Sequence, residues 1–576
     1  MAASTHTVTN QSPPLTGYDV FAADRALSEA VARHLDPVLL PVAAAELSVL
    51  GEAAGSAQAQ EWGAQANENP PKLRTHDRYG HRIDEVDFHP AWHRVLGKGV
   101  GAGLTAAWAT PGGHVRRAAG FLVWSQVEAG HGCPLSMTHA AVPALRAEPE
   151  LAAEWEPRLT SRVYEAGLRP AASKAGALLG MGMTEKQGGS DVRGNSTVAR
   201  ALAADGEYAL TGHKWFCSAP MSDGFLVLAR AADGLTCFLV PRVLGDGSRN
   251  VFAIQRLKDK LGNRSNASAE VEFDGTWARR VGPEGRGVRT LVEMVAATRL
   301  DCVLGSAALM RQAVAQAVHH ATHREAFGGP LIDKPLMRNV LADLALESEA
   351  ATTLALRLAA ACDAAEAADG SGESERAFLR LAVPVAKYWV TKRCTPLVVE
   401  ALECLGGNGY VEESGMPRLL RESPLNSVWE GSGNVQALDV LRALQREPSA
   451  LNAFLVEVGR ARGADHRLDR AVRDLLTELA DLSGLEARAR RVRGRVVRTV
   501  AGVVPRRHGA TPAPGPVNGA RAERAAPCSA LNNVRRSARV AQGCNGSARS
   551  VCPDHVWGHH GYGGARSRMA VRAGGA

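Results

Sequence analysis

The chain has 576 residues, a length that predicts three to four domains and a large hydrophobic core. Hydrophobic residues make up 45% and charged residues 22%, which is ordinary for a soluble globular protein. The sequence argues against a membrane-spanning helix, which needs about 18 consecutive apolar residues, and against a signal peptide. Its ten cysteines show no paired spacing, which favours reduced thiols and a cytoplasmic location.

The net charge of +8 is divided unevenly along the chain. Residues 491–576 contain 15 Arg, no Lys and two acidic residues, and so carry +13. The preceding 490 residues are therefore mildly acidic, at about −5. The bulk charge does not indicate a nucleic-acid-binding protein, because the basic character belongs almost entirely to the tail.

The first 180 residues predict mainly helices separated by loops. The segment Asp24–Leu35 begins with an acidic capping residue and continues with apolar residues at helical spacing, so we expect a helix there. The segment 68–90 contains Pro70 and Pro71 and predicts a long surface loop.

The periodicity changes twice in the rest of the chain. Between about residues 195 and 285, short β-rich runs alternate with turn signals, which predicts a small antiparallel sheet or barrel. Residues 286 to about 445 contain three long apolar-periodic stretches, which predict a helix bundle. Apolar residues at helical spacing from Leu451 to Leu479 predict further helices.

Residues 491–576 are rich in Arg, Gly, Ala, Ser and Pro and show no sustained period. Two interpretations are open: a disordered basic tail, or an out-of-frame translation, since shifted reading of a GC-rich gene yields this composition. We favour the second. The spacing of the metal-binding residue types here fits no standard zinc finger, so we expect no metal site; these residues are Cys544, Cys552, His555, His559 and His560.

The segment Gly180–Ser196, GMGMTEKQGGSDVRGNS, lies where helical sequence gives way to β-rich sequence. Its glycines let the backbone approach a ligand, and Thr184 and Ser190 offer hydroxyls to phosphate or carbonyl oxygens. It matches neither the Walker pattern nor the dinucleotide-binding fingerprint. On its own it therefore indicates only a glycine-rich loop.

Two later segments also carry candidate chemistry. Gly212–Pro220, GHKWFCSAP, is an aromatic-rich strand that by itself indicates core packing. Asn426–Asn434, NSVWEGSGN, places Glu430 before a Gly-Ser-Gly run. A partly desolvated glutamate there can act as a general base, although a surface glutamate near a helix start is the commoner case. Ser432 lies in E-G-S-G and not in a nucleophile elbow, which argues against a hydrolase.

Together the three segments resemble the motifs of the acyl-CoA dehydrogenase superfamily. The segment MGMTEKQGGSDV resembles the corresponding segment of the AidB-like alkylation-response branch. It is similar to the family's TE-x-x-x-GSD flavin-binding motif. GHKWFCSAP is similar to the strand beside the isoalloxazine, with Phe216 in the usual tryptophan position. NSVWEGSGN is similar to the catalytic segment, which implies that Glu430 is the catalytic base.

Three supporting segments occur in the family's order, and the resemblance covers about residues 10–490. Arg256–Phe273 resembles the closing strands of the family's barrel, and Ala401–Glu413 its Q-x-x-GG-x-GY motif. Arg324–Arg338 resembles the R-x-x-F-G motif, whose Arg and Phe reach the FAD of a neighbouring subunit. Pro335 and Glu403 stand where many relatives have Gln.

The resemblance implies an α+β fold that is mostly helical with a central β domain. The implied domains are an N-terminal helical domain at 1–180, a β-barrel at 181–285, a four-helix-bundle-type domain at 286–445, the start of an extra helical, DNA-binding-type domain at 446–490, and the basic tail at 491–576.

The resemblance also implies an FAD-dependent acyl-CoA dehydrogenase that acts on a short branched acyl-CoA thioester of isovaleryl type. Glu430 would remove the α-proton while the β-hydride moves to flavin N5. The family usually forms homotetramers, built as dimers of dimers. The residues implied to contact FAD are Met181, Gly182, Met183, Thr184, Gly189, Ser190, Phe216, Cys217, Ser218, Arg324, Phe327, Val428, Trp429, Gly431, Ser432, Gly433 and Asn434.

AidB-like proteins are associated with DNA binding and with protection against alkylation, so the resemblance implies double-stranded DNA as a second partner. The candidate contacts are Arg442, Arg467, Arg470 and Arg473, each explained equally well as a solvated helix charge. The sequence contains no helix-turn-helix, zinc-finger or RNA-binding motif. The alternative is an ordinary metabolic acyl-CoA dehydrogenase without a DNA role.

Overall fold

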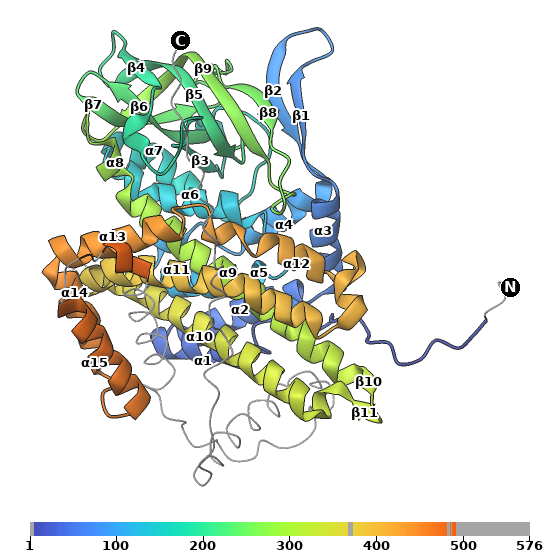
Figure 1. Cartoon of the computed structure of the whole chain (residues 1–576). Helices are drawn as coiled ribbons and strands as arrows, with labels where there is room; N and C mark the ends of the chain where they lie inside the picture. Colours follow the sequence, from blue (N-terminus) through green and yellow to red (C-terminus); the bar gives the residue numbers. More distant parts are fainter. Residues whose placement is uncertain (1–4, 367–371, 481–483, 485, 491–576) are drawn as a thin grey trace, which may run out of the picture.

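The computed structural model describes residues 5–366, 372–480, 484 and 486–490. It confirms the predicted fold class, a mostly helical chain with a central β region, and the β-rich half lies above the helical half in Figure 1. No helix within these ranges is long and apolar enough to cross a membrane. The predicted basic tail, with the five cysteine and histidine residues considered above as metal ligands, lies outside the described residues.

The N-terminal region is mainly helical, as predicted. Asp24 caps the first helix, because its carboxylate accepts a hydrogen bond from the Leu27 amide at 3.2 Å. The helices here are α1 (Arg25–His34), α2 (Leu40–Ala54), α3 (Ala57–Glu68), α4 (Pro90–Gly101), α5 (Gly113–Trp124), α6 (Gly132–Leu145) and α7 (Pro149–Leu159), with short 3-10 turns η1 (Ala107–Ala109) and η2 (Ala171–Ser173).

The prediction of a long loop at residues 68–90 is wrong, because this segment contains a β-hairpin. Asp77 organises its turn by accepting hydrogen bonds from two backbone amides of the turn. The Ile254 amide donates to the Asp84 carboxylate at 2.9 Å, which attaches the hairpin to the β-rich half (Figure 1). The strands of the hairpin are β1 (Lys72–His76) and β2 (Arg82–Asp87).

The central region forms one sheet from β3 (Leu179–Gly182), β4 (Val198–Ala201), β5 (Glu207–Ser218), β6 (Gly224–Ala231), β7 (Gly234–Pro241), β8 (Ala253–Leu257) and β9 (Ser268–Val281), with the turn η3 (Val192–Gly194). Five of the strands close into a ring in the order β6, β4, β5, β9, β7 and back to β6, which is a barrel. The sheet is not purely antiparallel, because β3 and β4 both pair with β6 in parallel.

Three long helices cross the helical half, as predicted: α9 (Val292–His323), α10 (Pro335–Ala365) and α11 (Glu373–Glu403). A buried ion pair ties α9 to α5, since the Arg117 guanidinium contacts both Asp301 oxygens at 2.5 and 2.7 Å. Removing one partner of such a pair costs about 3–5 kcal/mol, because the other charge stays buried. The pair therefore fixes the helix that passes beneath the barrel relative to the N-terminal helices.

Helices continue beyond residue 446, as predicted. Arg357 of α10 contacts the buried Glu457 carboxylate at 3.0 and 3.1 Å, which docks the next helices on the bundle. The predicted domain limits themselves remain a proposal. The remaining elements are α8 (Gly287–Thr290), β10 (Glu325–Ala326), β11 (Gly329–Pro330), η4 (Leu331–Asp333), η5 (Gly406–Tyr410), η6 (Glu412–Ser414), α12 (Met416–Glu422), η7 (Leu425–Ser427), α13 (Gly433–Arg446), α14 (Pro448–Gly459) and α15 (His466–Ala480).

Candidate active site

The segment that contains the TE motif follows β3, and its turn is built around the buried carboxylate of Glu185. Glu185 is 0% exposed and lies 2.6 Å from the Lys214 ammonium of β5. Its oxygens also accept hydrogen bonds from the hydroxyls of Ser196 and Thr197. These contacts hold the pKa of Glu185 below its usual range although burial opposes ionisation. The ion pair therefore fixes the segment against the barrel.

The same segment forms a close-packed cradle around Thr184. A Cβ atom added to Gly189 would lie 2.4 Å from the Thr184 hydroxyl oxygen, so only glycine fits there. Thr184, Met181 and Met183 are partly exposed, and Ser190 is exposed. The hydroxyls and backbone amides of this segment are therefore accessible to a phosphate-bearing ligand.

Strand β5 presents alternate side chains to the same region. Phe216 is 51% exposed and Ser218 is partly exposed, whereas the Cys217 side chain is fully buried in the barrel core. Because of this alternation, a contact between Cys217 and a cofactor would involve the backbone of this residue and not its thiol. An exposed aromatic ring beside a hydroxyl suits one face of a flat heterocycle.

Glu430 lies in a strained turn between η7 and α13. Its φ is +55°, the left-handed region, and the following Gly431 has a φ of +92°. The Thr298 hydroxyl of α9 donates to Glu430 Oε2 at 2.8 Å. Burial raises the pKa of Glu430, and the hydrogen bond from Thr298 opposes that shift. A carboxyl group with a raised pKa is suited to exchange protons near neutral pH.

Three side chains hold the Glu430 turn through its backbone. The Lys387 ammonium of α11, 1% exposed, donates to the carbonyls of Trp429 and Gly431 at 2.7 and 2.6 Å. Arg299 and Gln436 donate to the Glu430 carbonyl at 3.1 and 2.9 Å. The carboxylate is thereby oriented by three helices at once.

A small hydrophobic cluster joins the three motif segments in space. Ala219, at the end of β5, packs with Cys133 and with partly buried Met181 and Trp429. The structure thus brings the TE segment, the aromatic strand and the Glu430 turn together, although they are far apart in the chain. Gly433 is buried, whereas Val428, at 63%, and Ser432 and Asn434 are exposed beside this junction.

The exposed ring of Phe216, the glycine cradle and the hydroxyls of Thr184, Ser190 and Ser218 fit a flavin with phosphates. Gly182 serves packing instead, since a Cβ there would crowd the buried side chains of Lys214 and Cys217 at 3.2 and 3.3 Å. Across the described ranges no group of three His, Cys, Asp or Glu side chains could hold a metal ion.

The structure does not bring Arg324 and Phe327 to this junction. Both follow α9, and the labels β10 and β11 mark their position at the far end of the bundle (Figure 1). Arg324 donates to the Asn10 carbonyl, and Phe327 is 92% exposed. Within one chain these residues have no part in the Glu430 site.

The candidate DNA-binding arginines lie on two helices. Arg442 of α13 is 58% exposed and lies 3.6 Å from Asp439. Arg467, Arg470 and Arg473 are all exposed along α15, and Arg467 pairs with Asp465 at 3.0 Å. Because residues three apart are neighbours on a helix, these three form a basic stripe.

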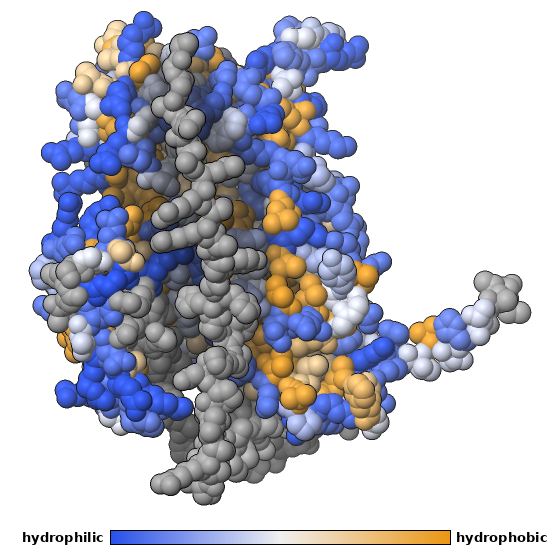
Figure 2. Space-filling model, in the orientation of Figure 1, coloured by the Kyte–Doolittle hydropathy of each residue, from blue (hydrophilic) through white to orange (hydrophobic). Residues whose placement is uncertain are grey.

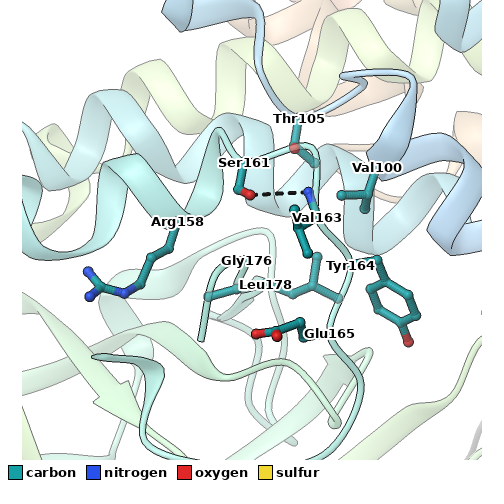
Figure 3. A pocket seen from close by; sticks show the side chains of 10 residues that line it. Val100, Thr105, Arg158, Ser161, Val163, Tyr164, Glu165, Gly176 and Leu178 are labelled. Atoms are coloured by element: carbon teal, nitrogen blue, oxygen red, sulfur yellow. Dashed lines mark hydrogen bonds between the residues drawn. The ribbon is translucent and has the colours of Figure 1, made fainter. Parts of the chain in front are cut away.

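A separate pocket lies between the end of α7 and the start of β3 (Figure 3). Ser161 Oγ accepts a hydrogen bond from the Val163 amide at 3.1 Å on its wall, and Tyr164 and Glu165 also line it. It shares no lining residue with the Glu430 junction.

Sequence reasoning missed the residues that orient Glu430: Thr298, Arg299, Lys387 and Gln436. The sequence marks them only weakly, because each is a single polar residue within a predicted helix. Arg299 is also linked to α13, because its guanidinium lies 2.6 Å from Asp439.

Three protein-family models match the chain in order. They are described as the adaptive response protein AidB N-terminal domain, at residues 10–166, the acyl-CoA dehydrogenase middle domain, at 180–276, and the acyl-CoA dehydrogenase C-terminal domain, at 285–445.

Two curated relatives are similar over most of their length. The putative acyl-CoA dehydrogenase AidB of Escherichia coli (strain K12) is 47% identical over 82% of this chain and 87% of that protein. Acyl-CoA dehydrogenase family member 11 of Caenorhabditis elegans is 32% identical over 77% of this chain and 74% of that protein. A mitochondrial isovaleryl-CoA dehydrogenase of Oryza sativa is 28% identical, over 46% of this chain and 63% of that protein.

Two solved structures share the fold over nearly their full length. The apo-form of Bd2924 has a TM-score of 0.79 at 30% identity and covers 86% of this chain and 99% of that one. Caenorhabditis elegans ACDH-11 in complex with C11-CoA also has a TM-score of 0.79, at 26% identity, and covers 95% of this chain and 100% of that one.

Proposed function

Because the chain belongs to the acyl-CoA dehydrogenase family, with an AidB-type N-terminal domain, we propose that it is an FAD-dependent enzyme that oxidises the Cα–Cβ bond of an acyl-CoA thioester. The observation that carries this proposal is the partly buried, oriented carboxylate of Glu430 beside Trp429, Met181 and Ala219. When bound, FAD supplies the hydride acceptor. Thr184, Ser190, Phe216 and Ser218 would hold it.

Glu430 takes the α-proton of the thioester onto a carboxylate oxygen. Thr298 already donates to Oε2, so we assign the proton transfer to Oε1. The hydrogen bonds of Lys387 and Gln436 to the turn fix the direction of the carboxylate, which lowers the cost of reaching the reactive geometry. We propose a short branched acyl group as substrate, as for the isovaleryl-CoA relative.

Anaerobic addition of acyl-CoA thioesters should bleach the visible absorbance of the FAD-loaded protein. Only ionised Glu430 accepts a proton, so the bleaching rate should rise with pH through the raised pKa of this carboxyl. Stopped-flow spectra across a panel of chain lengths and pH values measure both effects. Absence of bleaching with every thioester would contradict the proposed function.

DNA binding is a second candidate function, favoured by the exposed stripe of Arg467, Arg470 and Arg473 on α15. Each phosphate contact contributes about 0.9 to the slope of log affinity against log salt. Changing all three to Gln should therefore lower that slope by about 2.7, measured by fluorescence polarisation with duplex DNA. The matched control changes three exposed arginines elsewhere, Arg25, Arg74 and Arg169. An equal decrease of the salt slope in this control would exclude the stripe as the DNA-binding site.

We further propose a cytoplasmic homotetramer with a role in the DNA alkylation response. Exposed apolar side chains support subunit contacts: Phe327 is 92%, Tyr410 82% and Leu336 81% exposed. Figure 2 shows apolar residues gathered on the right of the helical half. The match to the N-terminal domain of an adaptive response protein supports a role in a stress response of this kind.

A further inference from the structure

A cluster of buried polar side chains lies beside the Glu430 junction and has no part in the proton transfer. Cys133 of α6 packs in the same small cluster as Trp429. The connection between β8 and β9 brings Lys260 next to it, and the Lys260 ammonium donates to Ser268 Oγ at 3.1 Å. Ser268 lies 3.4 Å from the Ser218 hydroxyl, which faces the proposed flavin site. The cluster therefore lies directly beside the Glu430 junction, where the proposed function requires the acyl chain of the thioester.

Asn266 is the member of this cluster with unmet hydrogen-bonding capacity. It is 1% exposed, and neither its Oδ1 nor its Nδ2 has a hydrogen-bond partner among the described residues. Its side chain faces the thiol of Cys133, a weak partner. A buried amide without partners costs about 1–3 kcal/mol, so the position calls for a ligand group that can both donate and accept.

The charges around Asn266 favour a neutral ligand group over an anion. Lys260 lies near two buried carboxylates, Glu128 and Glu422. Burial disfavours ionisation of Glu128, but His131 and Ser265 hold its pKa below the usual range. Burial raises the pKa of Glu422 to about 7, so this group is partly neutral at physiological pH. The positive charge of the Lys260 ammonium is thus already compensated by the neighbouring carboxylates. A ligand carboxylate would add an uncompensated buried negative charge.

We propose that Asn266 determines acyl specificity by pairing with a neutral hydroxyl on the acyl chain of the thioester. This inference rests on the proposed dehydrogenase function and revises the acyl group named there, because the short branch would carry a hydroxyl in place of the methyl of an isovaleryl group. A hydroxyl donates to Oδ1 and accepts from Nδ2, so one group satisfies both amide atoms. A methyl branch of the same size satisfies neither, and a site that hydrogen-bonds a substrate rejects the analogue that lacks the partner.

The test compares thioesters that differ only by hydroxyl against methyl: 3-hydroxybutyryl-CoA with isovaleryl-CoA, and 4-hydroxyvaleryl-CoA with 4-methylvaleryl-CoA. Their affinities are measured by calorimetry on the FAD-loaded Glu430→Gln protein, so that no turnover occurs. In at least one pair the hydroxyl compound should bind about tenfold more tightly, and Asn266→Leu should remove that preference. Equal or tighter binding of the methyl compound in both pairs overturns the inference.

Two controls separate specificity from folding. Arg264→Gln, an exposed position on the same connection, should keep the preference. Asn266→Leu should keep its FAD content and melting temperature, since it removes an unsatisfied buried amide; if it fails to fold, Asn266→Ala, which removes the amide without adding bulk or charge, replaces it. A preference that survives the Asn266 change contradicts the inference. Failure of the wild-type protein to bleach contradicts the dehydrogenase function, whereas the binding ratio tests specificity without turnover.

Discussion

Replacing Glu430 with Gln should lower the rate of flavin bleaching by acyl-CoA at least about 10³-fold, while FAD stays bound. The amide keeps the shape of the carboxylate and can still pair with the Thr298 hydroxyl, but it cannot take the α-proton. The measurement is single-turnover stopped-flow absorbance under anaerobic conditions, with FAD content read from the spectrum.

The matched control for that variant is Glu413→Gln, which removes the same charge from an exposed position outside the site. It should bleach at the wild-type rate. If Glu430→Gln bleaches as fast as this control, Glu430 is not the base. If it loses FAD, the residue serves cofactor binding instead.

Replacing Lys387 with Met should destabilise the protein by about 2–4 kcal/mol and slow bleaching about 100-fold. Methionine fills a similar volume, but the Trp429 and Gly431 carbonyls would lose the ammonium that bonds both of them. The Glu430 turn, with its positive φ, would then relax away from the reactive geometry. Urea unfolding and stopped-flow reduction measure the two effects.

Lys98→Met, at an exposed position on α4, is the control for loss of a helical lysine and should change neither quantity. A Lys387→Met protein with wild-type stability and rate would show that the turn holds its geometry unaided.

The motif segments could be recognised from the sequence because each concentrates several unusual residues in a short stretch. Long amphipathic helices were predictable for a similar reason, since their period is repeated over many turns. Asp24 as a helix cap is local chemistry and was also predicted correctly.

What the sequence did not reveal depends on tertiary contacts. Pro70 and Pro71 indicated a loop, yet they only precede a hairpin whose turn is organised by Asp77. Lys387 looks like any lysine in a helix until α11 is placed beside the Glu430 turn. The unpaired amide of Asn266 is likewise visible only after the β8–β9 connection packs against α6.

The hydrogen bond between Glu430 and Thr298 joins residues 132 positions apart in the chain. Lys387 and Gln436 donate hydrogen bonds to the same turn from two further helices. Closing a loop of this length is slow, because the chain loses conformational entropy before the stabilising contacts are made. A nascent chain that has completed only its N-terminal region and barrel could already cradle a nucleotide, yet it would carry no aligned base. We therefore expect the site to become competent for proton transfer only after α9, α11 and α13 have docked around the turn.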